Sequence, residues 1–165
     1  MIRPITKEDI KESVNVIRTS FLTVAEEFGL TEENAPRYVA FATTEDRLMY
    51  QMEVEKRPMY AFFSDDGKML GYYSLAKLSD DEWELNNLCV LPEHRNEGIG
   101  DKLLTDAFAK AKELGAKKLH IGIVEENVRL RKWYESEGFI HLGAKKFDFF
   151  PFTCGYMKIR LDQEI

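Results

Sequence analysis

The sequence is poor in the residues that build disulfide frameworks and metal sites. It holds two cysteines, Cys89 and Cys154, which stand far apart and in no pairing motif. Because no secretory signal is recognisable, we expect a cytoplasmic location in which both thiols stay reduced. The three histidines, His94, His120 and His141, lack the spacing of metal ligands. We therefore expect neither a disulfide nor a bound metal ion.

Long apolar runs and an excess of positive charge are also missing. No run approaches the roughly 20 apolar residues that span a bilayer, so no membrane partner is expected. Lysine and arginine number 23 against 29 acidic residues, a net charge of −6. Nucleic-acid binding calls for a concentrated basic surface, so a nucleic-acid partner is not expected either. An anionic ligand would need local positive potential, because the overall field repels it.

What is present is the composition of a globular protein: 44% hydrophobic and 32% charged residues in a chain of 165. That length predicts one domain over residues 1–165. A period of 3.6 residues predicts helices at 7–28, less regularly at 34–55, and at 98–114 and 127–136. Alternation predicts strands at 1–6, 59–64, 68–78, 82–91, 118–124, 138–146 and 153–161, the second and third forming a hairpin.

This order, β-α-α-β-β-β-α-β-α-β-β, predicts an α/β fold. We expect a mixed, mostly antiparallel sheet of about seven strands with helices on both faces. At the start of the first helix, Thr6 and Asp9 form a variant of the capping box, and Gly29 marks the end of that helix.

The most informative stretch runs from residue 85 to residue 104 and reads LNNLCVLPEHRNEGIGDKLL. An apolar strand ends at Pro92, Arg95 opens a loop, and Gly98 and Gly100 stand where a helix begins. Free backbone N–H groups at a helix start bind anions, and glycine lets the main chain approach the ligand closely. A dinucleotide-binding fingerprint does not fit because its first glycine is missing, and a P-loop does not fit because Gly-Lys-Ser/Thr is absent. The pattern predicts a phosphate site of another kind.

A second segment, residues 127–139, places a tyrosine two helical turns from a capping residue. Asn127 follows a strand end and can cap the helix, and Tyr134 lies seven residues later on nearly the same face. A hydroxyl there can donate a proton to a group held at the Asn127 end of the helix. The alternative is an ordinary amphipathic helix with Tyr134 in the core and Gly138 after its last turn.

Together the two segments resemble the GNAT superfamily of N-acetyltransferases. The resemblance is carried by Arg95, Gly98 and Gly100, the strand 88–92, and Asn127, Tyr134, Gly138 and Phe139. It covers roughly residues 60–145 well and the N-terminal helices loosely. Leu130 stands where the family often has a small alanine, and Trp133 where it often has leucine or phenylalanine. Both departures concern how the short helix packs near the pantetheine arm, and neither touches the anion loop.

The resemblance implies acetyl-CoA as co-substrate, lying where the strands 82–91 and 118–124 splay apart. The diphosphate would sit on backbone N–H groups of the loop, with Arg95 adding charge. A bulge in the strand 88–90 would aim one N–H at the thioester oxygen. The acidic side chains of the loop would point to solvent. The implied cofactor-binding residues are Leu88, Cys89, Val90, Arg95, Asn96, Glu97, Gly98, Ile99, Gly100, Asp101 and Asn127.

The implied reaction is direct transfer of acetyl to a primary amine, on a small molecule or on a protein. Tyr134 would protonate the departing thiolate as general acid. Glu84 is the candidate base. It lies eleven residues before Arg95, a sequence separation similar to that of the glutamate base in the histone-acetylating branch of the family. Glu82 and a water chain are the alternative bases, and the alternative interpretation of Glu84 is a solvent-facing strand residue. Direct transfer needs no acyl-carrying cysteine, so a buried strand position is favoured for Cys89.

The acceptor site is expected between residues 20–40 and the link between the last two strands. That link, residues 147–152, holds four phenylalanines that would line a pocket, fill a core or cover a subunit interface, which leaves a homodimer open. A cationic acceptor or plain solvation would account for the acidic residues Glu26, Glu27, Glu32 and Glu33. The main rival function is a non-catalytic acyl-CoA-binding or sensing module on the same fold.

Overall fold

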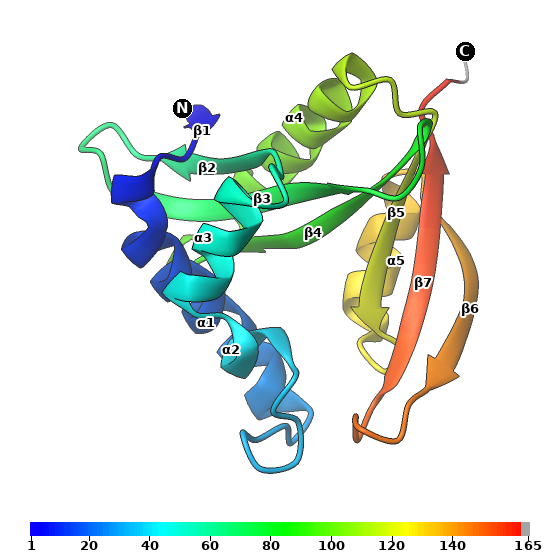
Figure 1. Ribbon diagram of the computed structural model, residues 1–165. Coiled ribbons are helices and arrows are strands. Elements are labelled where there is room, and N and C mark those ends of the chain that lie inside the picture. The colour runs from blue at the N-terminus through cyan, green and yellow to red at the C-terminus, as the bar shows by residue number, and fades with distance from the viewer. Residues whose placement is uncertain (163–165) are drawn as a thin grey trace.

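The computed structural model describes residues 1–162 around one seven-stranded sheet with strand order β1-β2-β3-β4-β5-β7-β6 (Figure 1). The strands are β1 Ile2–Pro4, β2 Met59–Phe63, β3 Met69–Lys77, β4 Glu82–Val90, β5 Lys118–Val124, β6 Ile140–Lys146 and β7 Thr153–Arg160. The α-helices are α1 Ile10–Glu27, α2 Val39–Ala42, α3 Glu45–Glu53, α4 Ile99–Glu113 and α5 Val128–Ser136. Among residues 1–162, the β4–β5 pair is the only parallel one. The predicted mixed, mostly antiparallel sheet is confirmed.

Strand β3 lies at the centre of the core. Its residues Met69 to Leu75 are all buried, so this strand is covered on both faces rather than on one. Strand β2 beside it alternates between buried and half-buried residues, as a strand nearer the edge does. The hairpin between the two strands closes through Gly67, whose φ of 87° requires a left-handed conformation.

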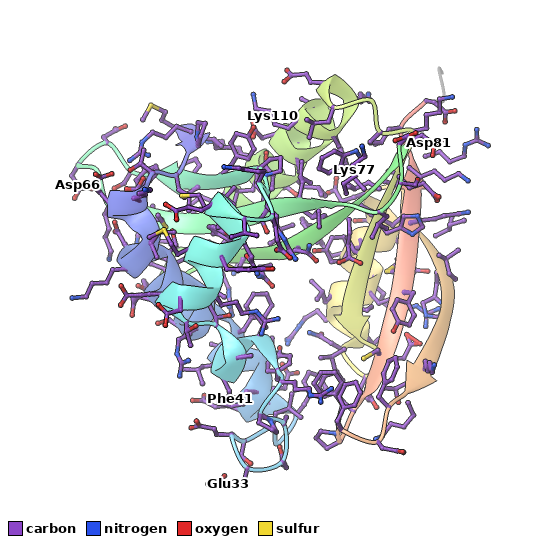
Figure 2. The ribbon with its side chains drawn as sticks, viewed as in Figure 1. Glu33, Phe41, Asp66, Lys77, Asp81 and Lys110 are labelled. Atoms are coloured by element: carbon purple, nitrogen blue, oxygen red, sulfur yellow. The ribbon has the colours of Figure 1, made fainter. Side chains whose placement is uncertain are left out.

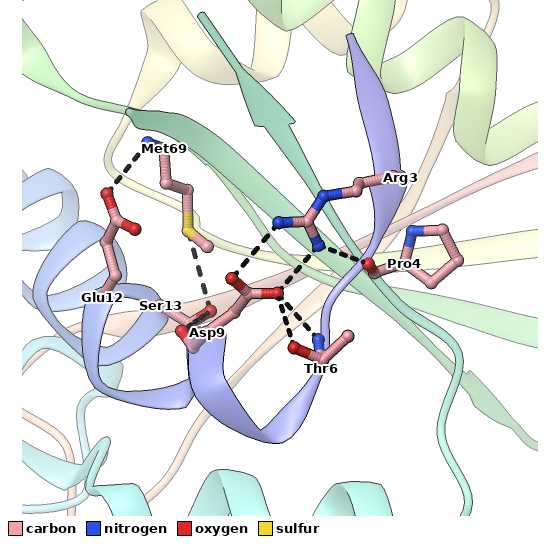
Figure 3. A network of polar contacts seen from close by, with 7 residues as sticks. All are labelled: Arg3, Pro4, Thr6, Asp9, Glu12, Ser13 and Met69. Atoms are coloured by element: carbon pink, nitrogen blue, oxygen red, sulfur yellow. Dashed lines mark hydrogen bonds and ion pairs between the residues drawn. The ribbon is translucent and has the colours of Figure 1, made fainter. Parts of the chain in front are cut away.

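The N-terminal helix begins as the capping pattern predicts, with one turn of 3-10 helix at Lys7–Asp9 before α1 (Figure 3). The Asp9 carboxylate accepts a hydrogen bond from the Thr6 backbone N–H (2.8 Å) and another from Arg3 (2.8 Å). Further along α1, the Glu12 carboxylate accepts from the Met69 backbone N–H (2.9 Å). The bond to Arg3 thus ties the start of α1 to β1, and the bond from Met69 ties it to β3.

The predicted helical region at residues 34–55 is two helices rather than one. Helix α2 ends at Ala42 and α3 begins at Glu45, and Thr44 between them is extended. The Thr44 hydroxyl accepts a hydrogen bond from the Arg47 backbone N–H (3.1 Å), so Thr44 is an N-cap that starts a new helix. This break turns α3 toward the end of β4 where the sheet opens.

The sheet opens because β4 and β5 pair over only three residues. Their register runs from Glu82 opposite Lys118 to Glu84 opposite His120, after which the strands diverge (Figure 1). Beyond Glu84, strand β4 carries a bulge, since Asn87 and Leu88 together lie opposite one residue of β3. Asn87 has a φ of 57°, and the extra residue of a bulge leaves backbone groups unpaired. The predicted splay and the predicted bulge are both present.

Gly71 permits the close packing of α4 against this part of the sheet. A Cβ at this position would lie 2.9 Å from the Cys89 carbonyl oxygen and 2.8 Å from a Leu103 methyl group. We therefore expect Gly71→Ala to lower the free energy of unfolding by about 1–3 kcal/mol, measured by urea denaturation. Gly122→Ala is the control, because its Cβ would meet only the Gly155 carbonyl at 3.9 Å. Equal stability of the two variants would contradict this account of the packing.

Candidate active site

A cavity of about 610 Å³ lies between α1, the end of β4 and α5. It is lined by many of the residues that the resemblance singled out: Leu88, Cys89, Val90, Arg95, Asn96, Gly100, Asn127 and Tyr134. The other predicted cofactor-binding residues, Glu97, Gly98, Ile99 and Asp101, belong to the loop and first turn of α4 beside it. We call this space the coenzyme-side cavity. The fold thus gathers two segments that are about 30 residues apart in the sequence.

The loop before α4 has the backbone shape of an anion site. Asn96 and Gly98 both have positive φ, at 66° and 82°, and successive N–H groups in such a turn form a concave cradle. The first turn of α4 leaves its N–H groups without intrahelical partners, and the first intrahelical bond runs from Lys102 N to Gly98 O (3.2 Å). The side chains of Glu97 and Asp101 are exposed, whereas that of Ile99 is buried. Main-chain donors rather than side chains are therefore available to an anion at this loop.

Arg95 has a structural task that the sequence did not reveal. Its guanidinium donates to Ser20 O (2.9 Å), Thr23 Oγ1 (3.0 Å) and Val90 O (3.3 Å). Arg95, which is 75 residues from Ser20 in the sequence, therefore holds the second half of α1 against the end of β4. Its charge stays at the wall of the coenzyme-side cavity, and its contact with a diphosphate stays a prediction.

Tyr134 is buried, with 6% of its surface exposed, and its ring packs edge-on against Phe139 at 5.2 Å. It lines the coenzyme-side cavity at the same time, so it belongs to the core and to the cavity wall, and its role as general acid stays a prediction. Burial raises the pKa of the Tyr134 hydroxyl, which therefore keeps its proton well above neutral pH. A protonated hydroxyl at the cavity wall can act as a general acid.

Cys89 and Asn127 have structural roles in this cavity. Burial raises the pKa of the Cys89 thiol to about 12, so the thiolate needed for an acyl-carrying nucleophile is scarce near pH 7. Cys89 and Cys154 are both free thiols. The Asn127 side chain accepts from the Leu130 backbone N–H (3.3 Å), which confirms it as the N-cap of α5.

Glu84 stands where β4 and β5 part and is half-buried rather than solvent-facing. Burial raises the pKa of its carboxyl group, and the nearby Arg57 and His120 oppose that rise. When the Asn86 amide nitrogen faces Glu84, it donates to Glu84 Oε1 over 2.6 Å. Glu82, the alternative base, is engaged with His120 Nε2 at 3.0 Å. Of the two carboxylates, Glu84 is the one that lines cavities.

Two smaller cavities continue from the coenzyme-side cavity. A middle cavity of about 270 Å³ shares Phe21, Val24, Asn127 and Leu130 with it. A third cavity, of about 260 Å³, shares Arg37, Val39, Glu84, Asn86 and Asn87 with the middle one. We call the third the acceptor-side cavity. The bulge on β4 therefore lies between the two ends of this series.

The phenylalanine-rich link between β6 and β7 serves as both core and cavity wall. Phe152 is buried in a small second core beneath Tyr38 (5.6 Å between rings), and Phe150 stacks on Phe152 at 4.6 Å. Both also line the middle cavity. Phe149 is 42% exposed and lies under the guanidinium of Arg37 at 4.3 Å. Residues 20–40 and this link are thus brought together as expected.

The four acidic residues near the end of α1 do not form the wall of the acceptor-side cavity. Glu26, Glu27, Glu32 and Glu33 are exposed, and Glu33 lies in the loop between α1 and α2, at the periphery of the molecule (Figure 2). Glu27 pairs with Arg129 at 3.0 Å beside the coenzyme-side cavity. Their position favours solvation over recognition of a cationic acceptor.

Among residues 1–162, no cluster of three histidine, cysteine or acidic side chains is placed to hold a metal ion. Within the same residues, no helix has both the length and the apolar character that crossing a membrane demands.

Comparison with known proteins identifies the family. The model of the Acetyltransferase (GNAT) family matches residues 27–139. An uncharacterized N-acetyltransferase of Mycobacterium tuberculosis is 30% identical over 82 residues, which are 50% of this chain and 53% of the relative. This chain therefore spans about half the length of that relative. The uncharacterized N-acetyltransferase YjgM of Escherichia coli is 28% identical over 148 residues, covering 86% and 83% of the two chains.

Among solved structures, the PaiA N-acetyltransferase of Thermoplasma acidophilum, crystallised in complex with coenzyme A, has the same fold. It is 19% identical, with a TM-score of 0.81 over 97% of this chain and 98% of the other. The match of the family model over more than half of the sequence, on a fold with these splayed strands, shows that the chain belongs to the GNAT family of acetyltransferases.

Proposed function

We propose that this protein transfers the acetyl group of acetyl-CoA to a primary amine by direct attack. One observation carries the proposal: the helix N-terminus after Gly98, the bulged strand β4 and Tyr134 all border a single cavity. The residues present fit the coenzyme. Main-chain N–H groups suit a diphosphate, the unpaired edge of β4 suits an amide-rich arm, and the apolar faces of Leu130 and Trp133 suit its aliphatic parts.

The roles of the residues follow from the order of the cavities. The thioester supplies the activated acetyl group. On the acceptor side, the Glu84 carboxylate takes a proton from the ammonium group so that the amine can attack. At the bulge, a backbone N–H stabilises the carbonyl oxygen as negative charge develops on it. On the coenzyme side, the Tyr134 hydroxyl gives its proton to the departing sulfur.

The test begins with thermal shifts against acetyl-CoA, CoA, NAD and ATP. Acetyl-CoA and CoA should each raise the melting temperature, because a ligand that binds only the folded state stabilises it. Release of free CoA thiol is then followed with a panel of amines. Thiol release that depends on the amine supports the transferase. Tight CoA binding with no thiol release from any amine would instead favour the sensing module, and no thermal shift at all would contradict both.

Gly100→Ala separates the coenzyme site from the stability of the fold. A methyl group here would stand 3.9 Å from the Trp133 ring and 4.0 Å from a Val90 methyl group, so the protein accommodates it. Alanine favours the helix by about 0.5–1 kcal/mol, yet the methyl group obstructs approach to the N–H groups of α4. We expect equal or higher stability in urea but roughly tenfold weaker CoA binding by calorimetry, the loss of about one charge-assisted hydrogen bond. Unchanged CoA affinity would mean that the diphosphate binds elsewhere.

A further inference from the structure

The acceptor-side cavity is positively charged although the chain as a whole is negative. Three arginines line it, Arg37, Arg47 and Arg57, against one carboxylate, that of Glu84. They come from the loop before α2, from α3 and from the segment after α3. In a chain of net charge −6, three guanidinium groups around about 260 Å³ are a local reversal of the overall field.

These arginines have hydrogen-bonding capacity left for a ligand. Within residues 1–162, the Arg47 guanidinium takes part in no hydrogen bond or ion pair. That of Arg37 lies over the Phe149 ring, which leaves the N–H groups at its edge available. Arg57 donates from Nε to Glu55 (2.7 Å) and from Nη1 to the reoriented Asn86 amide (3.3 Å). Glu55 thus pairs with Arg57, and the guanidinium groups of Arg37 and Arg47 have no carboxylate partner among residues 1–162.

The neighbouring acidic and polar groups leave room for both ends of a ligand that has an anionic group and an amine. The acidic residues closest in sequence to Arg47, Glu45 and Asp46, line a different cavity beside α1 and not the acceptor-side cavity. Gln51 lines the acceptor-side cavity, is 6% exposed, and its Oε1 has no hydrogen-bond partner among residues 1–162. A buried acceptor without a donor is costly, so an N–H group of the ligand's amine or a water molecule is expected to complete its hydrogen bonding.

We propose that the acceptor is a small amine that also carries an anionic group, a carboxylate or a phosphonate, a few bonds from its nitrogen. The arginines hold the anion, and the amine points past Glu84 toward the bulge, because the acceptor-side and middle cavities meet at Glu84, Asn86 and Asn87. This inference rests on the proposed acetyl transfer and names its substrate class. Polyamines are disfavoured, because three guanidinium groups repel a second cationic centre.

The test uses pairs of amines that differ only in the anionic group: 2-aminoethylphosphonate against ethanolamine, and leucine against 3-methylbutylamine, with spermidine as the polycation. Thiol release from acetyl-CoA gives kcat/KM for each. Near pH 7 all these amines carry an ammonium group, and only one member of each pair carries an anionic group as well. We expect kcat/KM for that member to exceed the value for its partner by roughly tenfold or more in at least one pair, the effect of one charge-assisted contact. A preference for the amines without an anionic group, or for spermidine, would overturn the proposal.

Arginine variants link that preference to the cavity. Arg47→Gln should raise KM for the anionic acceptor by roughly 10- to 100-fold, leave KM for acetyl-CoA unchanged, and shrink the difference within each pair. Arg160→Gln is the matched control, because Arg160 lies on β7 and pairs with Asp162 outside this cavity. If Arg47→Gln changes KM equally for the amine with the anionic group and for its partner without it, or changes KM for neither, the arginine site is contradicted. Melting curves verify that each variant is folded.

The experiments distinguish failure of the proposed acetyl transfer from failure of the proposed anion site. If no amine releases thiol, acetyl transfer fails, and calorimetry with 2-aminoethylphosphonate and with leucine then judges the anion site alone. Binding that weakens in Arg47→Gln but not in Arg160→Gln retains the site as a binding site for small anionic amines. Absence of binding to the unmodified protein overturns it.

Discussion

Replacing Tyr134 by phenylalanine should lower kcat by about 10²- to 10⁴-fold, the usual contribution of a positioned general acid. The ring would keep its packing against Phe139, and only the proton donor would be lost. Thiol release at saturating amine measures kcat, and calorimetry should find CoA affinity unchanged. Tyr50→Phe is the control, since Tyr50 is 55% exposed on α3. If Tyr134→Phe kept full kcat, water or another group would be the proton donor.

The pH dependence of kcat adds a second readout for the same residue. Burial raises the pKa of the Tyr134 hydroxyl above its ordinary value near 10, so the acid form persists as the pH rises through neutrality and beyond. We therefore expect the kcat of the unmodified protein to show no fall between pH 7 and 9 that is due to ionisation of Tyr134. A fall in that range that vanishes in the variant would show the hydroxyl ionising early, contrary to its burial.

Glu84→Gln should lower kcat/KM at pH 7 by about 10²- to 10⁴-fold, because the glutamine amide cannot accept the ammonium proton. Burial raises the pKa of Glu84, and a base works only when it is deprotonated. In the unmodified protein, kcat/KM should therefore fall as the pH drops through a value above the ordinary glutamate pKa near 4.3. The fall should be absent from the variant, and a pH profile of initial rates measures both effects.

Glu82→Gln distinguishes the two carboxylates of this strand. Glu82 pairs with His120 at 3.0 Å and lines none of the three cavities, so we expect the variant to keep both its rate and its acid limb. Loss of the acid limb in Glu82→Gln, with Glu84→Gln active, would move the base to Glu82. Full activity of both variants would favour proton removal by a chain of water molecules.

Much of the fold was open to prediction because local patterns agree with the tertiary structure. The strand over residues 118–124 has the predicted bounds, since its alternating residues also alternate in burial over most of its length. The end of α1 at Gly29, with a φ of 67°, was predicted by the same logic of helix caps. The break at Thr44 was missed, although a threonine with two acidic residues after it is a recognisable cap signal.

Some residues of the candidate site were likewise predictable from the sequence, and others were not. Gly98, Gly100 and Asn127 act through the backbone near them, so spacing was enough to single them out. Arg37, Arg47 and Arg57 stand ten residues apart, the first before α2, the second in α3 and the third after α3, so no single local pattern groups them in one cavity. The hydrogen bond from Arg95 to Ser20 of α1 joins residues that are 75 positions apart, and no local sequence pattern predicts such a contact.

The short pairing between β4 and β5 determines where unpaired strand edges lie in this molecule. Most sheets present their unpaired edges at the outside, where a strand of another protein can dock and begin aggregation. Here two edges face each other inside the fold, from Leu85 onward on one side and from Ile121 onward on the other. Residues of α1 and α5 line the coenzyme-side cavity beside these edges. The short pairing therefore keeps two hydrogen-bonding edges within the fold, flanked by helices, and away from the outer rim where strand-to-strand aggregation begins.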